Sequence, residues 1–331
     1  MLVRMIALTA ALMWFIGSAL AAEIKPAIVY DLGGRFDKSF NQGVYKGAEK
    51  FKKDTGIEYR DFEIQNDSQR EQALRNFARR GFGPIIAVGF AQAAAVEKVA
   101  AEYPDTKFAI IDMVVDKPNV SSILFKEHEG SYLVGMLAAM ASKTGKVSFV
   151  GGMDIPLIRK FACGYVGGAK AAKADAEVFQ NMTGTTGAAW SDPVKGGELA
   201  KSQFGRGADV IYHAAGGTGL GVLQAAADQG HLGIGVDSNQ NHLHPGKVLT
   251  SMMKRVDIAT YSTFENAKND TMKAGTQILG LAEGGVGWAL DDNNKPLITP
   301  EMMAAVDKAK ADIVAGKVKV HDYMSDSKCP Y

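Results

Sequence analysis

The chain has 331 residues, and its 37 basic and 36 acidic side chains give a formal net charge of +1. This balance argues against nucleic acid or an anionic membrane as the main partner, because both attract strongly basic surfaces. A chain of this length is also long for one hydrophobic core, so we expect two domains of roughly 100–200 residues each.

The first segment, residues 1–22, has the features of a secretory signal. Arg4 supplies the positive end, the run from Met5 to Leu20 is largely apolar, and Ala19-Leu20-Ala21 fits a small-residue cleavage site. The run is short for a membrane span of about 20 residues, so an uncleaved anchor is the weaker alternative. We expect a mature periplasmic protein that begins at Ala22 or Glu23. Because no cysteine lies near the cleavage site, we expect no lipid anchor.

Beyond this segment, short apolar runs alternate with helical patterns. Several runs are rich in Ile and Val and apolar on both faces, which is typical of strands buried between layers of helices. The repeated alternation predicts an α/β protein with two parallel sheets. In chain order, the predicted strands are Ala27–Asp31, Tyr59–Ile64, Pro84–Val88, Phe108–Asp112, Ser121–Phe125, Lys146–Val150, Glu177–Gln180, Asp209–His213, Gly233–Asp237 and Val248–Met252.

Helix starts are marked by capping signals. Ser68-Gln69-Arg70-Glu71 fits a capping box, and Asp192-Pro193 and Thr299-Pro300 each place a capping side chain before a proline. A helical pattern runs from Asp257 to Leu281, and a strand-like run from Val286 to Leu290 follows it. This tail suggests that the chain crosses back between the two halves.

No disordered or low-complexity linker separates the halves. We expect a first lobe of residues 23–144 plus 253–284 and a second lobe of residues 145–252 plus 285–331. Two lobes that are joined by several crossings form a hinge, and hinged lobes close around ligands.

Polar and aromatic residues follow the ends of several predicted strands, where parallel sheets bind ligands. An ionised carboxylate accepts hydrogen bonds from two vicinal hydroxyls, and an aromatic wall contributes about 1–3 kcal/mol when a nucleobase stacks on it. The set therefore favours a small-molecule binder. Its members are Asp31, Phe40, Asn41 and Asp112 in the first half and Gly216, Gly217, Asp237 and Lys254 in the second half.

Some of these residues have a second interpretation. Each strand-end aspartate, Asp31 among them, is also a common turn residue, and Phe40 is also placed for a hydrophobic staple. Trp190 either packs within the second lobe or lines the site. Asp37 and Ser39 are expected to cap a helix rather than to contact a ligand.

Motifs of catalysis are missing from the sequence. The glycine loop from Gly217 to Gly221 resembles a dinucleotide fingerprint, but Val222 stands where the third glycine should be. No GxSxG, HExxH or P-loop lysine is present. We expect a protein that is not an enzyme and needs neither a cofactor nor a metal, with surface-loop histidines at His213, His231, His242 and His244.

The chain has two cysteines, Cys163 and Cys329. In an oxidising compartment they are enough for one disulfide that ties the C-terminal tail to the second half, and two unpaired thiols are the alternative. Chain entropy gives a bond that closes so long a loop about 4–5 kcal/mol of stability.

Several motifs together resemble the basic membrane protein family of ABC-transporter substrate-binding proteins, the purine nucleoside receptor-like group. The likeness spans the mature chain, with the motifs in order. They are Asp37-Lys38-Ser39-Phe40-Asn41, Ile110-Ile111-Asp112, Glu129-Gly130-Ser131-Tyr132-Leu133, Ala215-Gly216-Gly217-Thr218-Gly219, Ile234-Gly235-Val236-Asp237 and Leu249-Thr250-Ser251-Met252-Met253-Lys254.

This resemblance implies two Rossmann-like lobes with hinge crossovers, as in type I periplasmic binding proteins. It implies base stacking on Phe40 beside Asn41, a base contact from Asp31, and ribose contacts from Asp237 and Lys254. Asp112 and the glycine at 216 or 217 take further family positions, and Trp190 is the best candidate for the opposite aromatic wall.

The implied function is binding of a nucleoside, with a purine favoured, for uptake through an ABC permease in the inner membrane. We expect a monomer with no nucleic-acid partner. The alternatives are a type I binding protein for a sugar or another polar ligand, and a nucleoside sensor.

Overall fold

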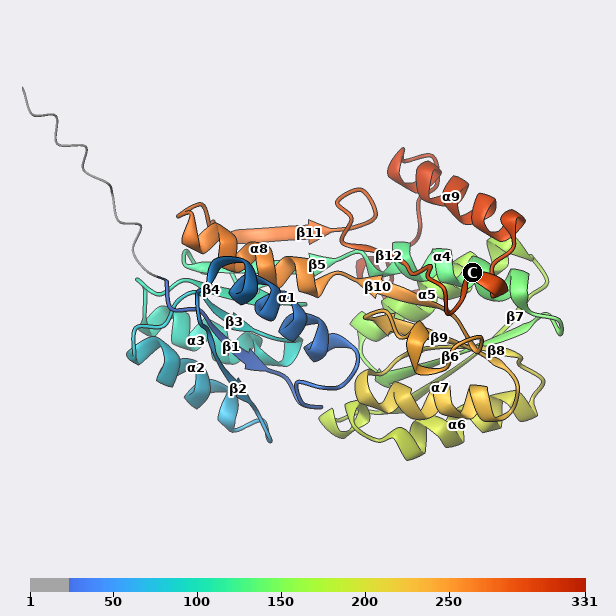
Figure 1. Ribbon diagram of the computed structural model, residues 1–331, viewed down its shortest axis with the longest axis horizontal. Coiled ribbons are helices and arrows are strands. Elements are labelled where there is room, and N and C mark those ends of the chain that lie inside the picture. The colour runs from blue at the N-terminus through green and yellow to red at the C-terminus, as the bar shows by residue number, and fades with distance from the viewer. Residues whose placement is uncertain (1–23) are drawn as a thin grey trace, which may run out of the picture.

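Two six-stranded sheets form the two lobes of the structure (Figure 1). The computed structural model describes residues 24–331, so the predicted signal segment lies outside the described residues. Both lobes are α/β, and their sheets are predominantly parallel, which confirms the predicted fold class. None of the helices within residues 24–331 is long and apolar enough to span a bilayer.

The first lobe has a fully parallel sheet in the order β11-β5-β4-β3-β1-β2. Strands β1, β3 and β4 are entirely buried, as apolar strands between helix layers should be. The elements of this lobe are β1 (Ala27–Tyr30), α1 (Phe40–Thr55), β2 (Arg60–Glu63), α2 (Gln69–Arg79), β3 (Ile85–Ala87), α3 (Ala93–Glu102), β4 (Phe108–Ile111), β5 (Val120–Phe125), α8 (Val256–Lys268) and β11 (Gly275–Leu279).

The second lobe has the sheet order β12-β10-β9-β8-β6-β7, in which only β12 is antiparallel to its neighbour. Its elements are α4 (Glu127–Ala141), β6 (Lys146–Met153), α5 (Pro156–Ala172), β7 (Glu177–Gly184), α6 (Pro193–Gly205), β8 (Val210–Ala214), α7 (Gly219–Asp228), β9 (Leu232–Asp237), β10 (Val248–Lys254), β12 (Val286–Trp288) and α9 (Pro300–Val314). All the strands predicted from the sequence are present, with some differences at their ends.

The chain passes between the sheets three times: after β5, after β10 and after β11. Helix α4 lies against α5 so closely that a Cβ added at Gly135 would stand 2.2 Å from the carbonyl oxygen of Tyr165. We therefore propose that α4 belongs to the second lobe and that the first crossing falls between Phe125 and Glu127, earlier than residue 144.

Two local predictions are wrong. The helical pattern from Asp257 to Leu281 divides into α8, which ends at Lys268, and the strand β11. Strand β11 lies at the edge of its sheet and is largely exposed, so it lacks the apolar signal of a buried strand. The capping box at residues 68–71 does not form, because the Ser68 hydroxyl donates to the Asn66 side chain instead.

Other local predictions are confirmed. The side chains of Asp192 and Thr299 accept hydrogen bonds from the first turns of α6 and α9. Cys163 on α5 is bonded to Cys329 in the C-terminal tail. A Cβ added at Gly167 on α5 would stand 2.6 Å from the nearest atom of the Tyr331 ring. The C-terminal tail therefore packs against the second lobe.

Candidate ligand-binding cleft

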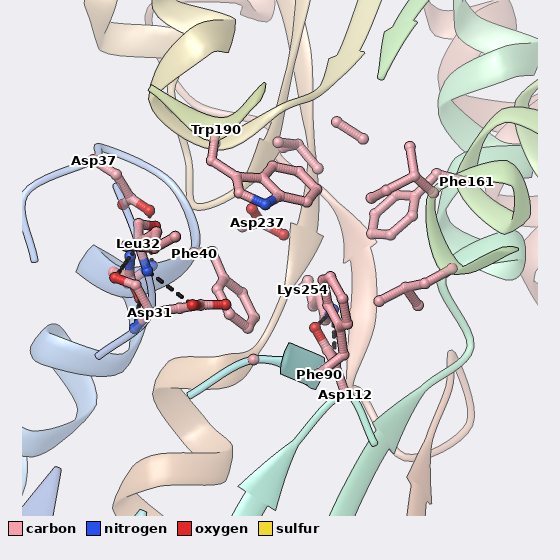
Figure 2. A pocket seen from close by; sticks show the side chains of 17 residues that line it. Asp31, Leu32, Asp37, Phe40, Phe90, Asp112, Phe161, Trp190, Asp237 and Lys254 are labelled. Atoms are coloured by element: carbon pink, nitrogen blue, oxygen red, sulfur yellow. Dashed lines mark hydrogen bonds and ion pairs between the residues drawn. The ribbon is translucent and has the colours of Figure 1, made fainter. Parts of the chain in front are cut away.

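A hollow lies between the lobes, at the carboxyl ends of strands from both sheets (Figure 2). The space between its walls is about 590 Å³, a volume that includes its opening to solvent. Among the residues that line it are Asp31, Phe40, Asn41, Asp112, Trp190, Gly216, Asp237 and Lys254.

The structure therefore brings together all but one of the predicted ligand-binding residues. The exception is Gly217, which is not part of the lining. It packs against the backbone of Trp190, where a Cβ at Gly217 would stand 3.2 Å from the Trp190 carbonyl oxygen. Its neighbour Gly216 has a φ of +54°, a left-handed conformation that glycine adopts without strain.

Aromatic rings form much of the wall. Phe40 begins α1, and Trp190 ends a short 3₁₀ turn before α6. Figure 2 shows both rings at the hollow, together with those of Phe90 and Phe161. A Cβ at Gly152 would lie 2.1 Å from the indole of Trp190, so this glycine makes room for the ring. The hollow can thus receive a flat, partly apolar group.

Two polar side chains hold the loop between β1 and α1. Asp37 accepts hydrogen bonds from the backbone N–H groups of Ser39 at 2.8 Å, Asn41 at 3.0 Å and Gln42 at 3.1 Å, so it caps α1 as predicted. Burial raises the pKa of Asp37 to about 6. The Asn41 side chain accepts from the Asp31 N–H at 3.2 Å and donates to the Asp31 carbonyl at 3.3 Å. Asn41 therefore shapes the loop from within.

Asp31, just after β1, is paired with a cation that reaches it from α2. Nη1 of Arg70 lies 2.7 Å from Oδ1 of Asp31, and both side chains are buried. Burial raises the pKa of Asp31, and the adjacent guanidinium partly offsets this effect. The sequence reasoning assigned residue 70 to a capping box and missed this pairing.

Lys254 is the centre of a buried cluster of charges. Its Nζ lies 2.7 Å from Asp112 and 2.9 Å from Glu127, and Glu127 is also 3.0 Å from Lys160. Burial raises the pKa of Asp112 to about 6, with Lys254 acting in the opposite direction. Burial would raise the pKa of Glu127 too, but the two lysines outweigh it and lower that pKa. Each carboxylate thus has a cation beside it, as burial requires.

Asp237 ends β9 and faces the cluster from the second lobe. Its φ of +63°, like the +75° of Asp112, is unusual for a residue other than glycine. Such strained positions concentrate at functional sites. Burial raises the pKa of Asp237 to about 6, while the charge of Lys254 and a hydrogen bond from Ser39 oppose the increase.

Direct hydrogen bonds join the lobes beside the hollow. The Ser39 hydroxyl donates to Oδ2 of Asp237 at 2.5 Å, and the Ser238 hydroxyl donates to the Ser39 carbonyl at 2.8 Å. Nε2 of Gln240 donates to the Lys38 carbonyl at 3.1 Å. Ser39 was expected to cap α1 but instead bridges the lobes, and we call these three bonds the interlobe latch.

His213 was expected in a surface loop, and this prediction is wrong. It lies on β8, fully buried, with Nε2 3.0 Å from Oε1 of Gln240. Burial lowers its pKa to about 4. The same Oε1 accepts from the Val236 N–H at 2.9 Å, so both contacts turn Nε2 of Gln240 toward the first lobe. His213 therefore helps to hold the Gln240 side chain in the orientation that the interlobe latch requires.

The sequence reasoning missed several residues of the site, for reasons that differ. Phe90 comes two residues after the predicted strand Pro84–Val88 and could have been included on that ground, whereas Phe161 lies within α5, where apolar residues at helical spacing are usually core. Glu127 stands between Lys126 and His128, and Lys160 follows Arg159, so neither charge differs from its neighbours in the sequence. Within residues 24–331, no group of three or more His, Cys, Asp or Glu side chains is arranged to hold a metal ion.

Comparison with known proteins identifies the family. A family model described as "ABC transporter substrate-binding protein PnrA-like", the Bmp family, matches residues 24–322. The chain belongs to this family. It is a family of substrate-binding proteins, in agreement with the resemblance read from the sequence motifs.

Among its relatives is a protein of Lactococcus lactis named "ABC transporter nucleoside-binding protein BmpA". The two are 35% identical over 324 residues, which cover 90% of this chain and 89% of the relative. Among solved structures, an ABC transporter solute-binding protein from Aeropyrum pernix superposes with a TM-score of 0.83 at 28% identity, over 90% of this chain and 93% of that one.

The relatives contradict the predicted localisation. A Pyrococcus furiosus relative that is 36% identical, over 81% of this chain and 71% of its own, is named an uncharacterized lipoprotein. Two further Pyrococcus relatives, at 36% and 37% identity, carry the same description. The prediction of a freely diffusing periplasmic protein without a lipid anchor is therefore wrong. It depended on the cysteine content of a segment that lies outside the described residues.

Proposed function

We propose that this ABC-transporter substrate-binding protein binds a nucleoside, with a purine favoured, in the interlobe hollow. The observation that carries the proposal is the meeting of aromatic rings and buried carboxylates in one hollow. A nucleoside needs both, because it joins a flat base to a sugar with vicinal hydroxyls. The name of the Lactococcus relative is consistent with this ligand.

The base is proposed to lie against Phe40, with Trp190 as the opposite wall. Both rings line the hollow and come from different lobes. Stacking on such rings contributes about 1–3 kcal/mol per base. A ligand held between them would join the lobes, so binding would favour the closed arrangement.

The ribose is proposed to meet Asp237, Asp112 and Lys254. Asp237 is a hydroxyl acceptor with only one oxygen bonded to Ser39. Lys254 is 2% exposed and already paired with two carboxylates, so it orients them as well as donating. Closure of the lobes over the ligand would then create the surface that a permease recognises. We further propose that the protein acts as a monomer.

A two-step binding experiment tests this function. A thermal-shift screen of nucleosides, free bases and sugars should raise the melting temperature with nucleosides most strongly, because a ligand that binds only the folded state stabilises it by mass action. Calorimetry on Asp237→Ala should then show a far larger loss of affinity for a nucleoside than for its free base. Equal losses would refute the ribose contact of Asp237, and a response to sugars alone would refute the nucleoside assignment.

A further inference from the structure

The C-terminal tail follows one stripe of helix α5, and Figure 1 shows the C-terminus beside this helix. Three residues of α5 spaced i, i+3 and i+7 share the stripe, namely Lys160, Cys163 and Gly167. The tail meets these three in turn with Asp322, Cys329 and Tyr331. We call residues 321–331 the strap.

The strap is folded on itself as well as bonded to α5. The His321 N–H donates to the Tyr331 hydroxyl at 2.9 Å, and Nε2 of His321 lies 3.0 Å from Oδ1 of Asp326. Cys329 is exposed, whereas Cys163 is only 1% exposed. The disulfide therefore anchors a compact loop, and a dithiol in solution can approach it from the Cys329 side.

Lys160 ties the two lobes together where the chain first passes between them. It extends from α5 in the second lobe, and its Nζ donates to the carbonyl oxygen of Phe125, the last residue of β5 in the first lobe, at 2.8 Å. The same Nζ lies 3.0 Å from Oε2 of Glu127, the first residue of α4. Because its side chain is only 8% exposed, Lys160 is held in this position with little access to water.

The strap supplies a further carboxylate to Lys160. Oδ2 of Asp322 lies 3.6 Å from Nζ of Lys160 and 3.9 Å from Nδ1 of His128. Lys254 lies 2.9 Å from the other oxygen of Glu127, Oε1. A row of ion pairs therefore runs from the strap to the hollow, through Asp322, Lys160, Glu127, Lys254 and Asp112.

We propose that the strap is a redox-sensitive restraint on the hinge. While the disulfide is closed, Asp322 is kept beside Lys160. Lys160 is thereby kept on the first crossing, which favours the arrangement in which the lobes meet. When the disulfide is opened, the strap is held by non-covalent contacts alone and the crossing loosens. Opening requires a dithiol: the sulfur–sulfur bond takes up two electrons and two protons to give two thiols, and the dithiol is oxidised to its own disulfide.

Hydrogen–deuterium exchange on the ligand-free protein is the first test, because it measures the crossing directly. Peptides that contain residues 125–129 should exchange about two- to fivefold faster in Cys163→Ser/Cys329→Ser, and in the wild type with dithiothreitol, as expected when a partly exposed ion pair is lost. Peptides from α2 and α3, at the end of the first lobe away from α5 (Figure 1), should be unchanged. Faster exchange that is confined to the strap would overturn the inference.

The second test separates the ion pair from a general loss of stability. Asp322→Asn keeps the disulfide and should speed exchange at the first crossing by the same factor. Added to Cys163→Ser/Cys329→Ser it should have little further effect, because the strap no longer holds the carboxylate beside Lys160. Effects that simply multiply would show that the disulfide and Asp322 act independently, and would overturn the inference.

Two more variants complete this comparison and do not depend on the disulfide. Lys160→Met should speed exchange at residues 125–129 at least as much as Asp322→Asn does, whereas Lys160→Arg keeps a cation and should stay close to the wild type. Asp312→Asn is the matched control, because it makes the same charge change on α9, where Asp312 pairs with Lys308 and Lys317 at the surface. Unchanged exchange in Lys160→Met would overturn the inference.

The third test measures the effect on ligand binding and rests on the nucleoside function proposed above. In calorimetry, the oxidised wild type should bind a nucleoside about two- to fivefold more tightly than the reduced wild type or Asp322→Asn. Dithiothreitol should not change the affinity of Cys163→Ser/Cys329→Ser. Equal affinities of the oxidised and reduced wild type would overturn the inference. Absence of binding by both forms would refute the proposed function, and the exchange measurements would then decide the inference by themselves.

Discussion

The pKa of Asp237 predicts how nucleoside affinity depends on pH. Burial raises that pKa to about 6 in the ligand-free protein, and ribose hydroxyls donate to the ionised form. Affinity should therefore increase as pH rises through about 6. Near pH 5 only about one carboxyl in eleven is ionised, so the dissociation constant should be about tenfold larger than near pH 7.5.

Calorimetry in two buffers that differ in ionisation enthalpy measures both the affinity and the protons released. About one proton should be released on binding near pH 5 and almost none near pH 7.5. Asp237→Asn should bind more weakly at every pH and should lose the part of this slope that Asp237 contributes, while Asp112, whose pKa burial also raises to about 6, keeps its own part. The reasoning is refuted if the wild-type affinity is flat or falls with rising pH, or if Asp237→Asn retains the full slope.

The same group affects stability in the opposite direction. Because the folded pKa of Asp237 lies above the ordinary value of 3.8, the folded protein binds the extra proton, and stability is lost as pH rises from about 4 to about 6. At neutral pH the cost is about 3 kcal/mol at most. Ligand-free Asp237→Asn should consequently melt at a higher temperature than the wild type near pH 7.5, a measurement independent of binding.

Three further predictions concern the walls, the charge cluster and the tail. Phe40→Ala and Trp190→Ala should each weaken nucleoside binding by about 1–3 kcal/mol in calorimetry while leaving any binding of free ribose unchanged. Lys254→Met should lower the free energy of unfolding in urea by about 3–5 kcal/mol, because it leaves the buried Asp112 without its cation and takes one of two cations from Glu127. Replacing Cys163 and Cys329 by Ser should cost about 4–5 kcal/mol by chain entropy, since the bond joins residues 166 apart in sequence; reductant should destabilise the wild type but leave the double variant unaffected.

Each of these has a contrary outcome. Equal losses for ribose and nucleoside would show that the rings support the fold and not the base. A cost below about 1 kcal/mol for Lys254→Met would mean that water reaches the cluster. A reductant effect on the double variant would show that the disulfide is not its target.

The regular parts of the fold follow from the sequence because they depend on local patterns. Buried strands such as β1 and β4 are apolar on both faces, which only a sheet between helix layers explains. Strand β11 was not predicted, because an exposed edge strand is not apolar on both faces. The assignment of α4 to the second lobe is a proposal that depends on its packing against α5, through close contacts such as that of Gly135 with Tyr165. Contacts so distant in sequence leave no local signal.

The same distinction applies to the site: residues marked by local patterns could be predicted, and residues brought in by tertiary contacts could not. Strand-end residues such as Asp31 and Asp237 could be predicted, because a parallel sheet brings strand ends to one edge. Their partners could not, since Arg70 and Ser39 reach them from other elements. Side chains that look like helix caps in the sequence make different contacts once the two lobes meet, as Ser39 does.

The interlobe latch also has a kinetic consequence. Its three bonds hold the lobes together beside the hollow, so we expect a ligand to enter only when the lobes separate. The observed association rate should then level off as ligand concentration rises, at the rate of opening, instead of increasing without limit. Ser39→Ala removes one of the three latch bonds and should raise that maximum rate, so the strength of the latch would set how fast the protein captures its ligand.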